Sequence, residues 1–301
     1  MSEASRPGPT DGTAAGKRQA LRAMVETRQA VLLPGAGNAL TARAIEQAGF
    51  SACYVTGAGV ANTLLGAPDL GLVTLTELAD TVAAISDVCA LPLVVDIDTG
   101  FGNALNLHRT MRAIERAGAS AVQLEDQPFP KRCGHFDGKA VIPLPEALAK
   151  LRAALDARED PGLMVIARTD AAAVEGFEAA MERAAAFAEA GADMTFVEAP
   201  ASRQELARVA GLPVPQVANM VVGGRTPLLP QAELAEMGFG VALYANAALQ
   251  AAMRVMAEVL GTLKSDGDLS RVMDRLAGFE ERQAMVDKAA WDALEARYRG
   301  G

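Results

Sequence analysis

The chain has 301 residues, of which 50% are hydrophobic, 22% charged and 4% aromatic, and its formal net charge is −9 with a pI of about 4.9. This acidity argues against nucleic acid and anionic membrane surfaces as partners, and no apolar run is long enough to span a bilayer. The three cysteines, Cys53, Cys89 and Cys133, form no C-x-x-C pair, and with no secretion signal they predict a reducing, cytoplasmic setting.

Residues 1–16 are polar and rich in Pro, Gly and Ser, which predicts a disordered N-terminal tail. A repeated pattern follows, in which an amphipathic helix ends at a glycine and an apolar, β-prone segment comes next. These glycines are Gly49, Gly118, Gly191 and Gly238, and glycine adopts the left-handed conformation at a helix end most easily. Strand candidates lie near residues 30–33, 52–56, 92–97, 120–125, 163–168, 194–198, 215–219 and 240–244, with helical patterns between them, for example over 76–88, 103–117 and 174–190.

Alternating strands and helices in this number predict a TIM (β/α)8 barrel. A doubly wound open sheet is the alternative, but no G-x-G-x-x-G follows the first strand. Two further helical stretches, 245–263 and 268–298, exceed what a barrel needs, and we expect them to pack on a partner subunit. The predicted organisation is therefore a barrel catalytic domain over 17–263 and a C-terminal helical extension over 264–301.

Polar or glycine-rich residues follow almost every predicted strand. Catalytic groups of a TIM barrel lie at the C-terminal ends of its strands, so these residues should meet at one face. In chain order they are Pro34-Gly35-Ala36, Thr56 to Gly59, Asp96 and Asp98, Glu125 and Asp126, Arg168 to Asp170, Glu198 to Pro200, Asn219, and Tyr244 to Asn246.

Asp96, Asp98 and Glu125 have the chemistry of a metal site. Two carboxylates two residues apart point to one side of a regular strand, and Glu125 ends a neighbouring strand. Oxygen ligands favour Mg²⁺ or Mn²⁺, with water and substrate oxygens completing the octahedron. The alternative for Asp98 is that it caps the helix beginning near Asn103.

The segment Lys131-Arg132-Cys133-Gly134-His135 places a thiol among cationic side chains. Such neighbours lower the pKa of a cysteine and make it reactive. The alternative is that Cys133 is an ordinary loop cysteine without a catalytic role. Arg168 ends an apolar strand, where a guanidinium suits a substrate carboxylate. An ion pair between Arg168 and Glu198 is the structural alternative, and the two interpretations are compatible.

The strings D-I-D-T-G-F-G, Q-L-E-D-Q, K-R-C-G-H and A-R-T-D-A resemble the isocitrate lyase/phosphoenolpyruvate mutase superfamily. The resemblance extends from about Leu33 to Gly261. The K-R-C-G-H string is its most specific part and resembles the short lyase branch of 2,3-dimethylmalate and 2-methylisocitrate lyases. Relatives often have Glu at Val222, and this departure leaves the choice of substrate open. They often have Ser at Thr56 and Gly at Ala58, where the contacts with the substrate would shift.

The resemblance implies a role for each matching residue. Asp96 and Asp98 would hold Mg²⁺, Asp69 and Glu125 would reach it directly or through water, Tyr54, Thr56, Gly57 and Ala58 would cradle the 2-oxo-acid half of the substrate, Arg168 would bind a carboxylate, Lys131, Gly134, His135, Glu198 and Asn219 would line the pocket, and Cys133 would be the acid. It also implies a homotetramer in which the last barrel helix is exchanged between subunits.

The implied reaction is Mg²⁺-dependent cleavage of a 2-hydroxy di- or tricarboxylate to pyruvate and a second carboxylic acid. An enolate would form and take its proton from Cys133, with Arg168, Glu125 and His135 also in the catalytic set. The base is left open between Tyr54 and a metal-linked carboxylate. Oxaloacetate hydrolysis or decarboxylation and phosphonomutase chemistry are the alternatives on the same fold. A non-catalytic barrel would be expected to have lost acidic or cationic site residues, and none is lost.

Overall fold

The computed structural model of the chain describes residues 12–131 and 138–299. Its eight strands are all parallel and pair in the order β6-β5-β4-β3-β2-β1-β8-β7. A further parallel bridge between Thr195 and Gln216 links β6 to the residue before β7 and closes the ring. The strands are β1 (Val31–Ala36), β2 (Cys53–Val55), β3 (Leu93–Asp96), β4 (Ala121–Glu125), β5 (Met164–Thr169), β6 (Met194–Val197), β7 (Val217–Asn219) and β8 (Val241–Tyr244). The predicted TIM barrel is confirmed, with a strand at every expected place.

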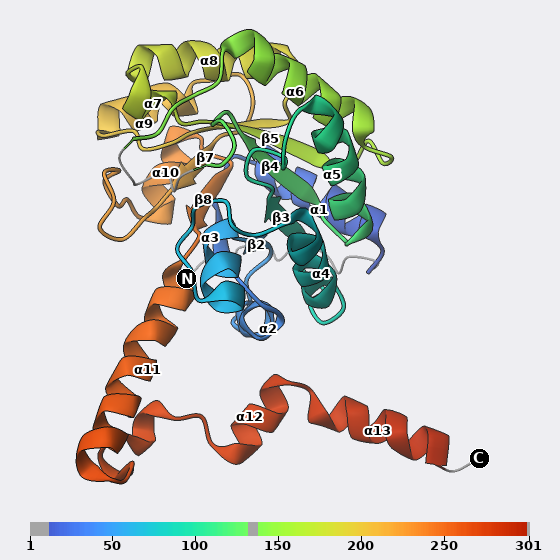
Figure 1. Cartoon of the computed structure of the whole chain (residues 1–301), viewed down its shortest axis with the longest axis vertical. Coiled ribbons are helices and arrows are strands. Elements are labelled where there is room, and N and C mark those ends of the chain that lie inside the picture. The colour runs from blue at the N-terminus through green and yellow to red at the C-terminus, as the bar shows by residue number, and fades with distance from the viewer. Residues whose placement is uncertain (1–11, 132–137, 300–301) are drawn as a thin grey trace. The chain divides into compact units, whose positions relative to one another are not determined.

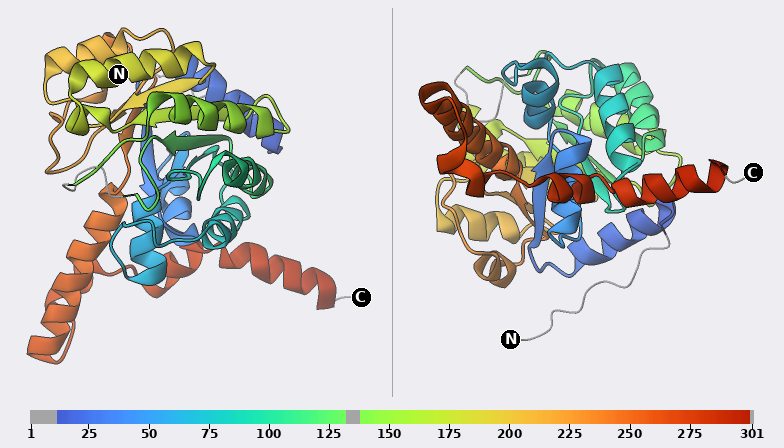
Figure 2. Two further views of the ribbon diagram at one scale, coloured as in Figure 1. Left: turned by 45° about the horizontal axis from the view of Figure 1, so that its top comes forward. Right: turned by 90° about the horizontal axis from the view of Figure 1, so that it is seen from below.

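Helices follow the strands and cover them from the outside, as Figures 1 and 2 show for α4, α5, α6 and α8. They are α2 (Ala39–Gln47), α3 (Gly57–Val60), the π-helical η1 (Ala61–Leu65), α4 (Leu75–Ser86), α5 (Ala104–Arg116), α6 (Leu144–Ala157), α7 (Ala171–Val174), α8 (Phe177–Glu189), α9 (Arg203–Ala210) and α10 (Gln231–Met237). The helix predicted over 174–190 is present as α8, which begins a few residues later because Gly176, with a φ of +99°, separates it from α7.

The side chains of each strand point alternately to two apolar regions, one inside the barrel and one between the strands and the helices. Tyr54, Val94 and Phe196 belong to the cluster that fills the barrel interior. Val55 and Val95, their neighbours along the chain, belong to the layer between strands and helices. Burial on both faces explains why the strand segments are nearly continuous apolar runs, and it leaves the strand ends as the place for polar side chains.

Helix α1 (Ala14–Glu26) begins inside the predicted tail, with the Thr13 hydroxyl accepting a hydrogen bond from Gly16 N at its start. Its Leu21 and Val25 join the interior cluster of the barrel. Arg18, buried to 5% exposure, pairs with Glu115 and Asp160. The helix therefore belongs to the folded barrel unit.

The chain separates into two compact units, with the division after Asn246. The second unit contains α11 (Ala247–Asp266), the 3-10 helix η2 (Ser270–Arg275), α12 (Phe279–Met285) and α13 (Lys288–Arg299). The expected boundary at 263/264 falls inside α11. The helical stretch predicted over 268–298 contains three separate helices, because extended backbone at Leu276 and a φ of +56° at Asp287 interrupt it.

No helix within the described ranges has the length and apolar character to cross a membrane.

The closure between β1 and β8 gives a test of the fold. A Cβ at Gly35 would collide with the main-chain carbonyl of Ala245, so Gly35→Ala must displace backbone. We expect it to lower the free energy of unfolding by about 1–3 kcal/mol in urea denaturation. Gly261→Ala is the control, because a Cβ there meets nothing within 4 Å. Equal effects of the two variants would contradict the tight contact.

Candidate active site

The predicted site residues within the described ranges gather at the C-terminal ends of neighbouring strands. Asp96 ends β3, Glu125 ends β4 and Asn219 ends β7. Arg168 lies in register beside Glu125 on β5, and Glu198 directly follows β6. The order of the strands thus brings together side chains that are far apart in the sequence.

Asp96 and Asp98 converge on the backbone of Gly57. A Cβ at Gly57 would lie 3.1 Å from Asp98 Oδ1 and 3.2 Å from Asp96 Oδ2. The convergence does not follow from a regular strand, because β3 ends at Asp96 and Asp98 has a φ of +49°. The Asp98 N–H donates to Asp96 Oδ1 at 3.1 Å and fixes the turn between them. Glycine at position 57 leaves room for both carboxylates.

Asp98 does not cap the next helix. Helix α5 begins at Ala104, and its cap is Asn103, whose side chain accepts from the backbone N–H groups of Leu105 and Asn106. That alternative interpretation of Asp98 is therefore wrong.

The Lys131 ammonium lies between two of the acidic groups. Its Nζ is 2.6 Å from Asp69 Oδ1 and 2.8 Å from Asp98 Oδ1. Burial raises the pKa of Asp98 to about 7, with Asp96 and Asp69 adding to the rise and Lys131 opposing it. The ionised form of this carboxylate thus depends on a neighbouring cation.

Arg168 faces three carboxylates. Asp170 binds it with both oxygens, at 2.9 Å from Nε and 3.2 Å from Nη2. Glu125 and Glu198 each approach a guanidinium nitrogen to 3.6 Å. The predicted pair with Glu198 is present, but Asp170 makes the closer contact. Among the described contacts of Arg168, none engages Nη1, so this nitrogen keeps donors for a ligand.

Asp170 belongs to a buried network of hydrogen bonds and ion pairs that fixes the guanidinium of Arg168. Lys139 Nζ lies 2.9 Å from Asp170 Oδ1. Asp126 accepts from the Thr169 hydroxyl at 2.7 Å and from the Asp170 N–H at 3.0 Å. Two neighbouring strands are thereby tied at the point where Arg168 projects.

Tyr54 lies in the barrel interior beside the carboxylates. Its hydroxyl donates to Gln123 Oε1 at 2.8 Å, and the Gln123 amide donates to Asp96 Oδ1 at 3.3 Å. Burial, reinforced by the charge of Asp96, raises the pKa of Tyr54 well above its usual value. The phenol therefore stays protonated near neutral pH and acts as a hydrogen-bond donor.

The remaining predicted residues border the same region. Thr56 caps α3 by accepting from Gly59 N, and its hydroxyl donates to Asn246 Oδ1 at 3.4 Å. Ala58 lies in the first turn of α3. Asn219 donates to Glu198 at 3.2 Å, and Asn219 Oδ1 is a buried acceptor with no hydrogen-bond partner in the described part of the chain.

Cys133, Gly134 and His135 lie outside the described residues, so their roles stay predictions. Val222 is 61% exposed, and Arg225 is also exposed.

The acidic groups fit a hard divalent ion. Within residues 12–131 and 138–299 no three acidic, histidine or cysteine side chains stand ready as a ligand set. Mg²⁺, however, uses one or two carboxylates and keeps water in its other positions. The converging Asp96 and Asp98 supply two, and Glu125 Oε1 is buried without a hydrogen-bond partner among the described residues. Burial raises the pKa of Glu125 well above its usual range, and a cation would stabilise its charged form.

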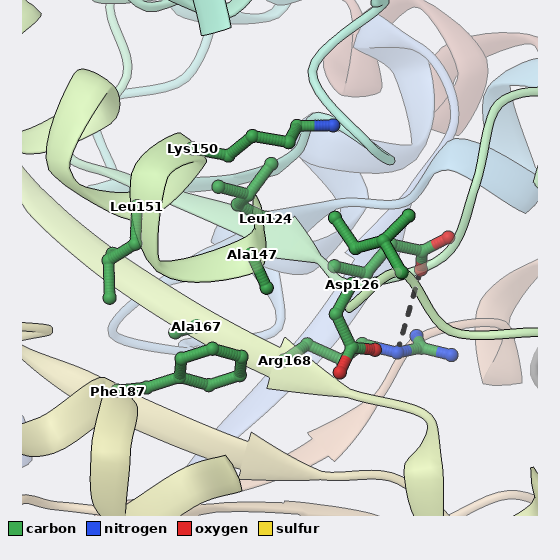
Figure 3. Close-up of a pocket in the computed structure, with 10 residues that line it drawn as sticks. Leu124, Asp126, Ala147, Lys150, Leu151, Ala167, Arg168 and Phe187 are labelled. Atoms are coloured by element: carbon green, nitrogen blue, oxygen red, sulfur yellow. Dashed lines mark ion pairs between the residues drawn. The ribbon is translucent and has the colours of Figure 1, made fainter. Parts of the chain in front are cut away.

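A pocket lies on the outer side of β4 and β5, against α6 and α8 (Figure 3). Its lining is Leu124, Glu125, Asp126, Ile142, Ala147, Lys150, Leu151, Ala167, Arg168 and Phe187. Leu124, Ala167 and Phe187 belong to the apolar layer between strands and helices, so the pocket is a packing gap behind the site.

Sequence reasoning missed Gln123, Lys139 and the tie between Asp126 and Asp170. Gln123 carried a signal, because it is a polar residue two positions before Glu125 and so shares its face of the strand. Asp170 was visible only as a polar strand end. Lys139 carried no signal, because it lies in a loop and its partner Asp170 is 31 residues further along the chain.

Fold and site together define an α/β-barrel protein that carries, at its strand ends, a group of carboxylates paired with a lysine and an arginine. The family model of phosphoenolpyruvate phosphomutase matches residues 21–264. The chain is 40% identical over 282 residues to a 2,3-dimethylmalate lyase of Eubacterium barkeri, covering 93% of this chain and 98% of that one. It is 41% identical to a 2-methylisocitrate lyase of Salmonella typhimurium, covering 93% and 96%. This chain therefore belongs to the phosphoenolpyruvate mutase/isocitrate lyase superfamily.

Solved structures agree with this assignment. A crystal structure of 2,3-dimethylmalate lyase has a TM-score of 0.87 and 33% identity, covering 94% of this chain and 95% of that one. A phosphonopyruvate hydrolase in complex with oxalate and Mg²⁺ has a TM-score of 0.84 and 32% identity, covering 94% and 99%.

The network behind Arg168 can be tested by stability. Asp170→Asn removes the charge that faces two buried cations, Arg168 and Lys139. We expect the free energy of unfolding to fall by about 3–5 kcal/mol, the range for breaking one partner of a buried pair, measured by urea denaturation. Glu178→Gln breaks the exposed pair with Arg208 and should leave the midpoint almost unchanged. A stable Asp170→Asn protein would contradict the role given to Asp170.

Proposed function

We propose that this chain is a Mg²⁺-dependent carbon–carbon lyase that cleaves a 2-hydroxy di- or tricarboxylate of the 2,3-dimethylmalate or 2-methylisocitrate type. The observation that carries the proposal is the convergence of Asp96 and Asp98, with the buried Arg168 two strands further along the barrel and 3.6 Å from Glu125. This pairs a place for a hard cation with a guanidinium for a carboxylate. The K-R-C-G-H sequence and the lyase relatives support the same reaction.

Asp96 and Asp98 would hold the metal, with Asp69 and Glu125 near it. When bound, Mg²⁺ would lower the pKa of the substrate hydroxyl and polarise the neighbouring carboxylate. The raised pKa of Tyr54 makes it a poor base, so a carboxylate of the acidic group is the better acceptor for the hydroxyl proton. Tyr54, Thr56, Gly57 and Ala58 would position the half of the substrate that becomes pyruvate.

Loss of the hydroxyl proton lets the C2–O bond become a carbonyl while the C2–C3 bond breaks. Its electron pair moves to C3 and forms the enolate of the second carboxylate. Arg168 and Lys131 would stabilise this negative charge. Cys133 would then give its thiol proton to C3. His135, Gly134, Glu198 and Asn219 would line the pocket around the departing acid.

The first test measures pyruvate release with Mg²⁺ from 2,3-dimethylmalate, 2-methylisocitrate, isocitrate and oxaloacetate. We expect release from one of the first two, and a loss of about 10²–10⁴-fold in kcat with Cys133→Ser, the range for general acid catalysis. Cys89→Ala, which changes a buried core cysteine, is the matched control.

Pyruvate from oxaloacetate alone, with Cys133→Ser fully active, would instead mean decarboxylation. Oxalate from oxaloacetate would mean hydrolysis, and turnover of a phosphonate would mean mutase chemistry. Each of these results rejects the lyase assignment.

Metal removal tests the acidic group separately. A chelator should abolish activity and added Mg²⁺ should restore it. Asp96→Asn should weaken Mn²⁺ binding by about tenfold or more, because it removes one of two charged ligands, as isothermal titration calorimetry would measure. Asp80→Asn, at an exposed position on α4, should bind Mn²⁺ as the wild type does. Activity that survives the chelator would exclude the metal.

We also propose a cytoplasmic homotetramer in which a C-terminal helix is exchanged between subunits. In the second unit Met256, Leu260 and Trp291 are 53%, 62% and 64% exposed, and such apolar side chains favour burial against a partner. Light scattering after gel filtration should give four times the chain mass for the wild type. Trp291→Asp should shift the protein to smaller species, and a monomeric wild type would refute the assembly.

A further inference from the structure

The Lys131 ammonium contacts the same carboxylate oxygen that borders the proposed metal position. Lys131 Nζ lies 2.8 Å from Asp98 Oδ1 and 2.6 Å from Asp69 Oδ1, and the residue is only 4% exposed. The same Asp98 Oδ1 and Asp96 Oδ2 are the two oxygens that a Cβ added at Gly57 would meet. One oxygen is therefore placed to serve two different cations.

We propose that Lys131 and the divalent cation compete for Asp69 and Asp98, so that metal binding releases the ammonium to the anionic substrate. This inference rests on the proposed function, because it uses the same metal position. It adds an order of binding: the divalent cation binds first, and the carboxylate substrate follows.

The charges around Lys131 explain why release and substrate binding are linked. A buried ammonium is costly unless a negative group faces it. Of the other carboxylates acting on Lys131, Glu125 is already close to Arg168, and Asp96 borders the metal position. An ammonium displaced from Asp69 and Asp98 therefore needs a new anion, and a substrate carboxylate supplies it.

Mn²⁺ and oxalate serve as the two probes, with the full-length protein at pH 8. We expect Lys131→Met to tighten Mn²⁺ binding by about tenfold or more, because the competing charge is gone. The same variant should bind oxalate to the Mn²⁺-loaded protein about tenfold more weakly, because the released cation is missing. Both constants come from isothermal titration calorimetry. General damage to the fold would weaken both ligands, so the opposite signs identify the competition.

Two further variants keep the test decisive. Lys131→Gln retains an N–H donor for Asp98, and it should shift both affinities in the same directions if Lys131→Met does not fold. Lys150→Met is the matched control, because Lys150 is also buried but donates to the Thr99 carbonyl at 2.5 Å and contacts no carboxylate within the described ranges. It should change Mn²⁺ affinity much less than Lys131→Met.

Unchanged or weaker Mn²⁺ binding in both Lys131 variants would overturn the inference. Tighter Mn²⁺ binding with unaltered oxalate affinity would overturn the release step. If Asp96→Asn abolishes Mn²⁺ binding while the Lys131 variants have no effect, only this inference fails. If Asp96→Asn leaves Mn²⁺ binding intact, the proposed metal position and this inference fail together.

Discussion

Buried like charges at the ends of adjacent strands are the constraint on which the site depends. Asp96, Asp98 and Glu125 are all under 10% exposed. Burial is the main cause that raises the pKa of Asp98 and Glu125, and neighbouring carboxylates add to it. Ionised carboxylates in such a place persist only beside cations. Lys131, beside Asp69 and Asp98, and Arg168, near Glu125, supply two positive charges. The resulting site suits a ligand that brings both a metal ion and carboxylates.

The interior of the barrel below these charged groups is apolar. Phe196 stands beneath the guanidinium of Arg168, with the ring centroid 5.1 Å from its central carbon. Two hydrogen bonds lead from that interior to Asp96, because Tyr54 donates to Gln123 and Gln123 donates to Asp96. The polar side chains therefore lie directly above a closely packed apolar interior. This packing restricts their conformations and keeps the carboxylates near one another.

Residues outside the site set the direction of those within it. Asp170, Asp126 and Thr169 hold the end of β5 from behind, and Lys139 adds a second cation to Asp170. A guanidinium held by Asp170 through Nε and Nη2 presents its remaining donors as a fixed fork. Such a fork recognises a carboxylate with less loss of conformational entropy than a free arginine side chain would.

The barrel could be predicted from the amino-acid sequence, because helix-ending glycines such as Gly118 and apolar strands such as 120–125 are local patterns, and small errors in their boundaries do not change the fold. The sequence also determined which strand ends carry charge, so Asp96, Glu125 and Arg168 could be placed at one face. Which charged side chains form ion pairs became visible only in the folded chain. The φ of +49° at Asp98, the approach of Glu125 and Glu198 to Arg168, and the contact of Lys131 with Asp69 all depend on neighbouring segments. Ion pairing is set by distances of a few ångströms across strands, and no periodicity within one strand encodes them.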